Sequence, residues 1–273
     1  MLDEVSGLLY TSDGYFFWLN DSGGAPALYQ TNGKGELIKT ITIPGVKNRD
    51  WEELTSDDKG RIYVGDFGNN RNKRKDLKIF RFDPATEKVD SILFTYPDQK
   101  DFPPARAKMN FDMEACFWLN GQLHLFSKNK VGVGDYVTKH YILSDQPGQQ
   151  VAKLNSQRPL TDRVVTAAAI SPDRKTVALL AYDYRLRKPF PYSAASVFLI
   201  RNFQGNNFFS GDIYRMKVPK FLVANQYESL DFIDDETIYI ATERVKFIRQ
   251  KAKRLRLKQK HFKRKWKEGS GSF

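Results

Sequence analysis

The sequence is poor in the residues that most catalytic motifs need. It has one cysteine, Cys116, which excludes a disulfide bond within the chain and, in an apolar run, favours a core position over a nucleophile. Its three histidines, His124, His140 and His261, are scattered. HExxH, GxxxxGK[ST], GxSxG and CxxC patterns are all missing. These absences exclude zinc proteases of the HExxH type, P-loop nucleotide binders, hydrolases with a GxSxG turn and CxxC redox proteins.

Long apolar runs are also missing. No stretch approaches the roughly 20 apolar residues needed to cross a bilayer, so no transmembrane segment is predicted. The opening residues, MLDEVSGLLY, have neither the basic start nor the apolar run of a signal peptide. Because they lead directly into a strand-like run, we expect that a leader has been removed.

Acidic residues are absent from one part of the chain. Residues 244–267 hold 13 Lys and Arg and no Asp or Glu. The formal net charge of the whole chain is +12, so the remaining residues carry −1, the difference between +12 and those 13 positive charges. Nucleic acid is therefore not an expected partner, because the rest of the chain lacks a broad basic face.

Five segments share one pattern of a short strand, a turn and a second strand. They are EVSGLLYTSDGYFFWLND, DWEELTSDDKGRIYVGD, DMEACFWLNGQLHLFSK, VVTAAAISPDRKTVALLAYD and QYESLDFIDDETIYIATE. Turns such as SDG, DDKG and LNG supply the Asp, Asn and Gly that tight hairpins require. Further strand-like runs, such as LKIFRFDP, SVFLIRNF and KHYILSD with QVAKLN, follow these pairs and give four strands per unit.

The spacing of the units predicts the fold. They begin near Ser6, Glu52, Glu114, Thr166 and Glu228, at intervals of 46, 62, 52 and 62 residues. Four-stranded antiparallel units at such spacing are typical of β-propeller blades. We therefore predict an all-β propeller with five blades, or six if a long interval hides a divergent blade. A β-sandwich would not explain five occurrences of one pattern.

The fifth unit is incomplete, because the sequence turns basic after TIYIATE. We predict that Ala252 to about Lys260 adds a strand to this blade, so that residues 1–260 form the propeller domain. Residues 261–273 are then expected to project as a basic, partly mobile C-terminal extension. Such an extension would dock on an acidic protein surface or on anionic lipid headgroups.

Equivalent positions in successive blades should form rings around the central channel, because the innermost strands line it. The first ring comprises Ser6, Glu52, Glu114, Thr166 and Glu228. The second ring, 14 to 17 residues further along each unit, comprises Asp21, Asp66, Lys128, Asp183 and Glu243. These ten residues are the candidate ligand-binding set.

The carboxylates of the rings would repel one another unless a cation, a proton or a hydrogen-bond network compensates them. Glu52, Asp66 and Glu114 are the candidate metal ligands, because carboxylate oxygens suit Ca²⁺ or Mg²⁺. The alternative is structural, with no cofactor: the acids cap strand ends, bind channel water and pair with basic side chains. The candidates for such pairing are Lys128, Arg49 and Arg244.

The run SGLLYTSDGYFFWLNDSGGAPALYQ, followed by DWEEL, IYVGDFGNNRNKR and LKIFRF, resembles a largely uncharacterised family of exported β-propeller proteins of Bacteroidota. The match is close over residues 6–82 and looser through the other units. The resemblance implies a periplasmic or secreted protein of the cell envelope. A more distant resemblance, in fold and acidic channel only, links the chain to phytase-like and other calcium-binding, esterase-like propellers. The chain has Glu53 where the family has Asp, and Asn69–Asn70 where the family often has Asp-Asn, which lowers the charge available to a cation in that loop.

Three functions are consistent with these patterns. The first is a non-enzymatic binding or scaffold protein that docks on a protein partner in the cell envelope, such as an outer-membrane complex. The second is a divalent-metal-dependent phosphoester hydrolase, with Lys128, Arg49 or Arg244 orienting an anionic substrate. The third is a carbohydrate-binding or peptide-binding propeller that uses aromatic side chains such as Trp51 and Tyr227.

Overall fold

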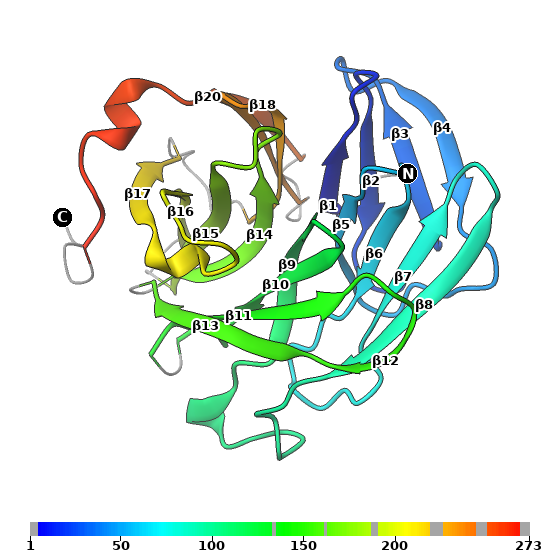
Figure 1. The fold of residues 1–273 in the computed structure, drawn as a ribbon, viewed down its shortest axis with the longest axis horizontal. Coiled ribbons are helices and arrows are strands. Elements are labelled where there is room, and N and C mark those ends of the chain that lie inside the picture. Colours follow the sequence, from blue (N-terminus) through cyan, green and yellow to red (C-terminus); the bar gives the residue numbers. More distant parts are fainter. Residues whose placement is uncertain are drawn as a thin grey trace.

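The computed structural model describes residues 5–132, 135–160, 163–186, 191–218, 226–243 and 250–267. They form five β-sheets arranged in a ring (Figure 1). The inner strands are β1 (Val5–Tyr10), β5 (Trp51–Ser56), β9 (Asp112–Leu119), β14 (Val164–Ile170) and β18 (Tyr227–Asp234). Each inner strand contacts the next one, and β18 returns to β1. The fold is therefore a five-bladed β-propeller, which confirms the predicted fold and excludes a sixth blade.

The remaining strands of each blade pair antiparallel in chain order from the centre outwards. They are β2 (Phe16–Asn20), β3 (Ala27–Thr31) and β4 (Leu37–Thr42) in blade 1; β6 (Ile62–Asp66), β7 (Lys78–Asp83) and β8 (Lys88–Thr95) in blade 2; β10 (Gln122–Lys128), β11 (Val137–Ser144) and β13 (Lys153–Pro159) in blade 3; β15 (Val177–Leu186), β16 (Pro191–Arg201) and β17 (Asp212–Lys217) in blade 4; and β19 (Thr237–Thr242) and β20 (Ala252–Arg256) in blade 5. The described residues also form three short 3-10 helices, η1 (Arg106–Lys108), η2 (Phe208–Ser210) and η3 (Gln259–Phe262). No described helix is long and apolar enough to cross a membrane.

The hairpin between β9 and β10 shows how the turn residues specify the blades. Leu119 pairs with Gln122, so only two residues, Asn120 and Gly121, make the turn. Both have positive φ, 50° and 76°. Asn and Gly are the residues that adopt this backbone conformation most readily, and such a turn matches the twist of the two strands.

Blades 2 and 3 are linked by two consecutive strands in a way that the repeat pattern did not predict. The run QVAKLN was expected to supply one outer strand, but it divides at Ala152. On one side, β12 (Gly148–Val151) pairs parallel with β8 of blade 2. On the other side, β13 pairs with β11 of blade 3. Strand β12 thus covers the outer edge of blade 2 and links it to blade 3.

Apolar side chains between neighbouring blades form the core. Between blades 1 and 2, for example, Leu9 and Phe17 pack with Leu54 and Val64, and all four are buried. Burial of such interfaces all around the ring fixes each inner strand relative to the next, and so fixes the geometry of the channel.

The C-terminal segment does not project as expected. Strand β20 forms as predicted, but the chain then turns towards blade 4. The Trp266 N–H donates to the Ile213 carbonyl at 2.6 Å, and the indole packs edge-on against Phe198. Phe262 packs edge-on against Tyr214. The expectation of a projecting extension is therefore wrong for residues 261–267, because these two aromatic side chains hold the segment against blade 4, and residues 268–273 lie outside the described residues.

Candidate functional site at the channel mouth

Every inner strand carries a β-bulge or register shift at the same level. In β5, Trp51 pairs with Asp66 and Glu53 pairs with Gly65, so Glu52 has no partner on β6. The same interruption includes Glu114 in β9, Thr166 in β14, Glu228 in β18 and the Ser6–Gly7 pair in β1. A bulge re-aims the extra side chain away from the regular alternation of the strand. The first predicted ring is thus the set of bulged residues.

The second ring lies at the same end of the blades. Asp66 and Lys128 are the last residues of β6 and β10, and Asp21 and Glu243 directly follow β2 and β19. Asp183 lies in β15 directly after Tyr182, which pairs with Val164 at the start of β14. Both rings therefore lie at the end of the channel where the inner strands begin, which is called here the channel mouth.

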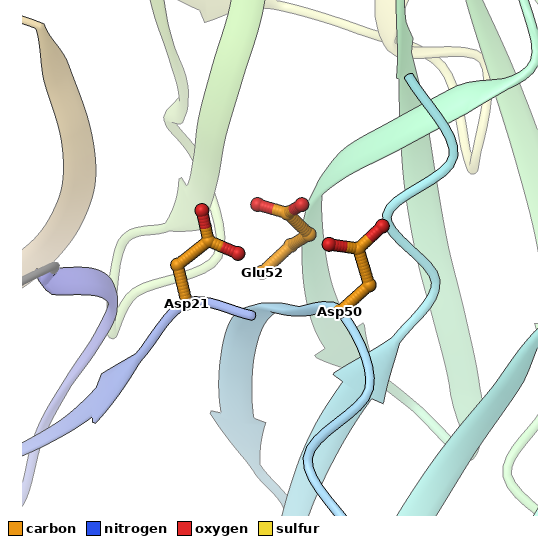
Figure 2. Close-up of side chains that lie close together, drawn as sticks. All are labelled: Asp21, Asp50 and Glu52. Atoms are coloured by element: carbon orange, nitrogen blue, oxygen red, sulfur yellow. The ribbon is translucent and has the colours of Figure 1, made fainter. Parts of the chain in front are cut away.

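Three carboxylates converge on one point of the mouth (Figure 2). Each of Asp21, Asp50 and Glu52 offers one oxygen, and these oxygens all lie within 4.8 Å of one another. Glu52 is buried, whereas Asp21 and Asp50 are half-buried. Asp50 immediately precedes β5 and was not in either predicted ring. The connection between blades 1 and 2 supplies it.

The electrostatics of this cluster favour a positive charge. Burial raises the pKa of Glu52 well above its ordinary value, and the nearby carboxylates of Glu114 and Asp21 raise it further. Burial also raises the pKa of Asp50, although the guanidinium of Arg74 acts in the opposite direction. Arg74 Nη1 lies 4.0 Å from the Asp50 carboxylate, at the limit of an ion pair.

The other two predicted metal ligands are paired with basic side chains. Lys128 Nζ donates to Glu114 Oε1 at 2.5 Å, and both side chains are almost fully buried. Burial acts to lower the pKa of Lys128, but Glu114 and other neighbouring anionic groups hold it well above its ordinary value. Asp66 accepts from Arg74 Nη2 at 2.9 Å. The metal set predicted from the sequence, Glu52, Asp66 and Glu114, thus differs from the cluster that the structure brings together.

Glu228 and Glu243 form a second acidic pair. Their side chains are hydrogen-bonded, and burial together with the charge of Glu228 raises the pKa of Glu243 to about 8. Gln226 Nε2 donates to Glu228 Oε1 at 3.2 Å. A carboxyl with this pKa holds its proton at neutral pH and can act as a hydrogen-bond donor.

The hydroxyl residues of the rings tie neighbouring inner strands together. Ser6 Oγ donates to the Glu52 carbonyl at 2.7 Å, which joins blades 1 and 2. Thr166 Oγ1 donates to the Tyr227 carbonyl at 2.8 Å, which joins blades 4 and 5. Burial lowers the pKa of the Arg215 guanidinium, and the negative charge of nearby Asp183 opposes this shift only in part. These residues stabilise the mouth without joining the three-carboxylate cluster.

The segment GDFGNN is a structural loop that supports the cluster. The Asn69 N–H donates to Asp112 Oδ1 at 2.6 Å, which fixes the loop to blade 3. Gly68 packs so closely that a Cβ there would lie 2.2 Å from Glu52 Oε1 and 2.6 Å from Asp50 Cγ. The backbone of the loop therefore contacts the carboxylates of Glu52 and Asp50 directly. Only glycine at position 68 permits this close approach.

Three residues proposed from the sequence as substrate contacts are engaged in other interactions, and a fourth lies outside the described residues. Arg49 pairs with Asp76 in an exposed ion pair. Trp51 and Tyr227 are buried in apolar clusters between blades, so they offer no surface on which a sugar could stack. Arg244 lies outside the described residues.

No protein-family model and no curated protein matches the chain. Solved structures resemble it. The α-L-arabinanase of Penicillium chrysogenum, determined with arabinobiose, superposes with a TM-score of 0.51 at 11% identity, over 88% of this chain and 78% of the arabinanase. A putative gluconolactonase superposes with a TM-score of 0.50 at 14% identity, over 93% of this chain and 76% of the other. At such low identity these likenesses show the propeller fold alone. The resemblance to the exported Bacteroidota family and the periplasmic or secreted location stay predictions.

Proposed function

We propose that the chain is a ligand-binding β-propeller of the cell envelope whose channel mouth holds a divalent cation, with Ca²⁺ as the first candidate. The cation presents its free coordination positions to an anionic group of a ligand or protein partner. The observation that carries this proposal is the convergence of Asp21, Asp50 and Glu52 within 4.8 Å. Three carboxylates supply part of the 6 to 8 oxygens that Ca²⁺ takes, which leaves positions for water and ligand.

The spacing and chemistry of the cluster suit such an ion. Two oxygens that bind one Ca²⁺ at roughly 2.3–2.6 Å can lie up to about 5 Å apart. The separations within the cluster, at most 4.8 Å, fit this limit. All three groups are carboxylates, the hard oxygen ligands that favour Ca²⁺ or Mg²⁺ over zinc or copper. Burial and then the repulsion of neighbouring carboxylates raise the pKa of Glu52, and a bound cation would offset both effects.

Thermal unfolding with Ca²⁺ and with a chelator tests the proposal. A ligand at 100 times its dissociation constant stabilises the folded state by about 2.7 kcal/mol, so the melting temperature should rise with Ca²⁺. Asp50→Asn should remove this rise, because an amide carries no charge for the ion. Asp58→Asn, which changes an exposed acid in the turn after β5, is the matched control and should keep it. Equal rises in the two variants, or none in the wild type, would contradict the proposal.

A metal-dependent phosphoester hydrolase is the second candidate, because the Glu243 carboxyl is protonated at neutral pH and could serve as a general acid. Hydrolysis of p-nitrophenyl phosphate with Ca²⁺ or Mg²⁺ distinguishes the two functions. Turnover that requires the ion and is lost in Glu243→Gln, while the variant still binds Ca²⁺, would favour the enzyme. Absence of turnover in a wild type that binds Ca²⁺ would favour the binding protein.

A further inference from the structure

The channel has a pocket at the end opposite the mouth. Beyond the bulges, all five inner strands line a pocket of about 170 Å³, called here the distal pocket. Its walls are residues 8–10, 54–56, 116–118, 168–170 and 230–232, with Pro172 at the rim. Because every blade contributes the same three positions of its inner strand, the pocket lies on the channel axis.

Glu53 separates the distal pocket from the mouth. At the equivalent position of the inner strand, the other four blades have the small residues Gly7, Ala115, Ala167 and Ser229. The Glu53 side chain is fully buried, and its Oε1 accepts from the backbone N–H of Leu8 at 3.4 Å and of Leu54 at 3.1 Å.

Leu8 and Leu54 both line the distal pocket, so Glu53 lies behind its wall and is not itself a lining residue. Glu53 Oε2 is buried and has no hydrogen-bond partner among the described residues. Burial raises the pKa of the Glu53 carboxyl well above its ordinary value, so this group favours its neutral form.

Asp231 supplies the acidic group of the distal pocket, and burial raises its pKa to about 7. Its two oxygens accept from the backbone N–H groups of Tyr10 at 2.7 Å and Phe232 at 2.8 Å. It is the only charged residue in the lining, and no Lys, Arg or His is among the lining residues, all of which the structure describes. Aromatic residues, Tyr10, Phe117, Trp118 and Phe232, make up much of the remaining wall. Carboxylate and aromatic groups together are the surroundings in which proteins bind organic cations.

We propose that the distal pocket binds a small primary alkylammonium ion. The ammonium group lies against the Asp231 carboxylate, and the alkyl group packs on the aromatic and aliphatic wall. A pocket of about 170 Å³ holds the volume of roughly five or six liquid waters, which limits the ligand to a few non-hydrogen atoms. This site is separate from the cation site of the mouth and takes an organic rather than a metal cation.

Calorimetric titration with propylammonium chloride tests the proposal on chelator-treated protein. Wild type should bind propylammonium, whereas propan-1-ol, which has the same chain without the charge, and sodium chloride at equal ionic strength should give no binding. Asp231→Asn should lower the affinity at least tenfold, and the exposed control Asp58→Asn should leave it unchanged. Equal binding of propan-1-ol, or undiminished affinity in Asp231→Asn, would overturn the proposal.

A second variant covers the case in which Asp231→Asn does not fold. Ile170 is half-buried and lines the distal pocket together with Asp231, so Ile170→Lys would place a tethered ammonium group in this pocket. This variant should fold and bind propylammonium at least tenfold more weakly, and wild-type affinity in it would contradict the proposal. Ca²⁺ binding is measured separately on the same proteins. Loss of propylammonium binding with Ca²⁺ binding intact therefore bears on the distal pocket alone.

Discussion

At the scale of single residues, Gly68 illustrates how the absence of a side chain sets the geometry of the mouth. A Cβ at this position would overlap Glu52 Oε1 and crowd Asp50. Gly68→Ala should displace both carboxylates, weaken Ca²⁺ binding at least tenfold and cost about 1–3 kcal/mol of stability, as overpacking of a close-packed site typically does.

Gly33→Ala is the control for this substitution, because an added Cβ at Gly33 meets nothing within 4 Å. Chemical denaturation and Ca²⁺ titration of both variants would check the prediction. If Gly68→Ala behaved like Gly33→Ala in both measurements, the close contact between the loop and the carboxylates would contribute neither to stability nor to Ca²⁺ binding.

The sequence predicted some residues of the site and missed others for identifiable reasons. The repeat alignment identified Glu52 and Asp21, because equivalent positions in successive blades are brought together by the ring. It could not identify Asp50, which lies in a connection between blades rather than in the repeated strands. It also could not show that Arg74 would reach back to Asp66, since that contact depends on the path of the loop.

At the scale of elements, the buried histidine pair of β10 and β11 is expected to make the protein sensitive to acid. His124 Nδ1 and His140 Nε2 lie 3.0 Å apart, and Phe126 stacks on His140. Burial lowers the pKa of His124 to about 4, and burial with the nearby His124 lowers that of His140 well below its ordinary value.

The sign of the pH effect follows from these directions. The folded protein favours neutral imidazoles, so the stabilisation is complete above about pH 6.5 and is lost as the pH falls towards 4. The shift of His124 alone corresponds to at most about 3 kcal/mol. His124→Gln should therefore show a smaller loss of unfolding free energy between pH 6.5 and 4 than the wild type, measured by denaturant titration. Burial and the neighbouring lysines lower the pKa of His261 as well, but this imidazole is only partly buried, so His261→Gln should change the slope less than His124→Gln does. An unchanged slope in His124→Gln would refute the prediction.

The C-terminal segment gives a second prediction at this scale. Trp266 is half-buried against Phe198 and bonded to β17, whereas Lys263 nearby is exposed. Trp266→Ala should cost about 1–3 kcal/mol of unfolding free energy, less than for a fully buried aromatic residue. Lys263→Ala should change it little, and equal effects of the two substitutions would mean that the segment does not contribute to the fold.

The strands were more predictable than their pairing. Alternating apolar residues and Asn, Asp and Gly turns identified the hairpins, because both are local properties of the chain. The division of QVAKLN between two blades depends on the free edge of β8, which is remote in sequence. The packing of the basic segment was misjudged because its charge concealed the apolar contacts of Phe262 and Trp266.

At the scale of the whole molecule, the propeller is near-neutral but has an acidic mouth. The mouth is acidic because the same bulge occurs in all five inner strands. The bulged residues and the ends of the second strands meet there because the ring closes from β18 to β1. Two of the acids, Glu114 and Asp66, are compensated by Lys128 and Arg74. The Asp21, Asp50 and Glu52 cluster is the part of the mouth for which we propose a cation.

Calorimetric titration of the wild-type protein with Ca²⁺ at several pH values tests this claim most directly. Because the pKa of Glu52 is raised by burial and by its neighbours, Ca²⁺ must displace a proton from the cluster in acidic solution. The account predicts one Ca²⁺ per chain, an affinity that increases with pH, and proton release that is detected by repeating the titration in buffers of different ionisation enthalpy. Absence of binding, or binding whose affinity and proton release do not change with pH, would contradict it.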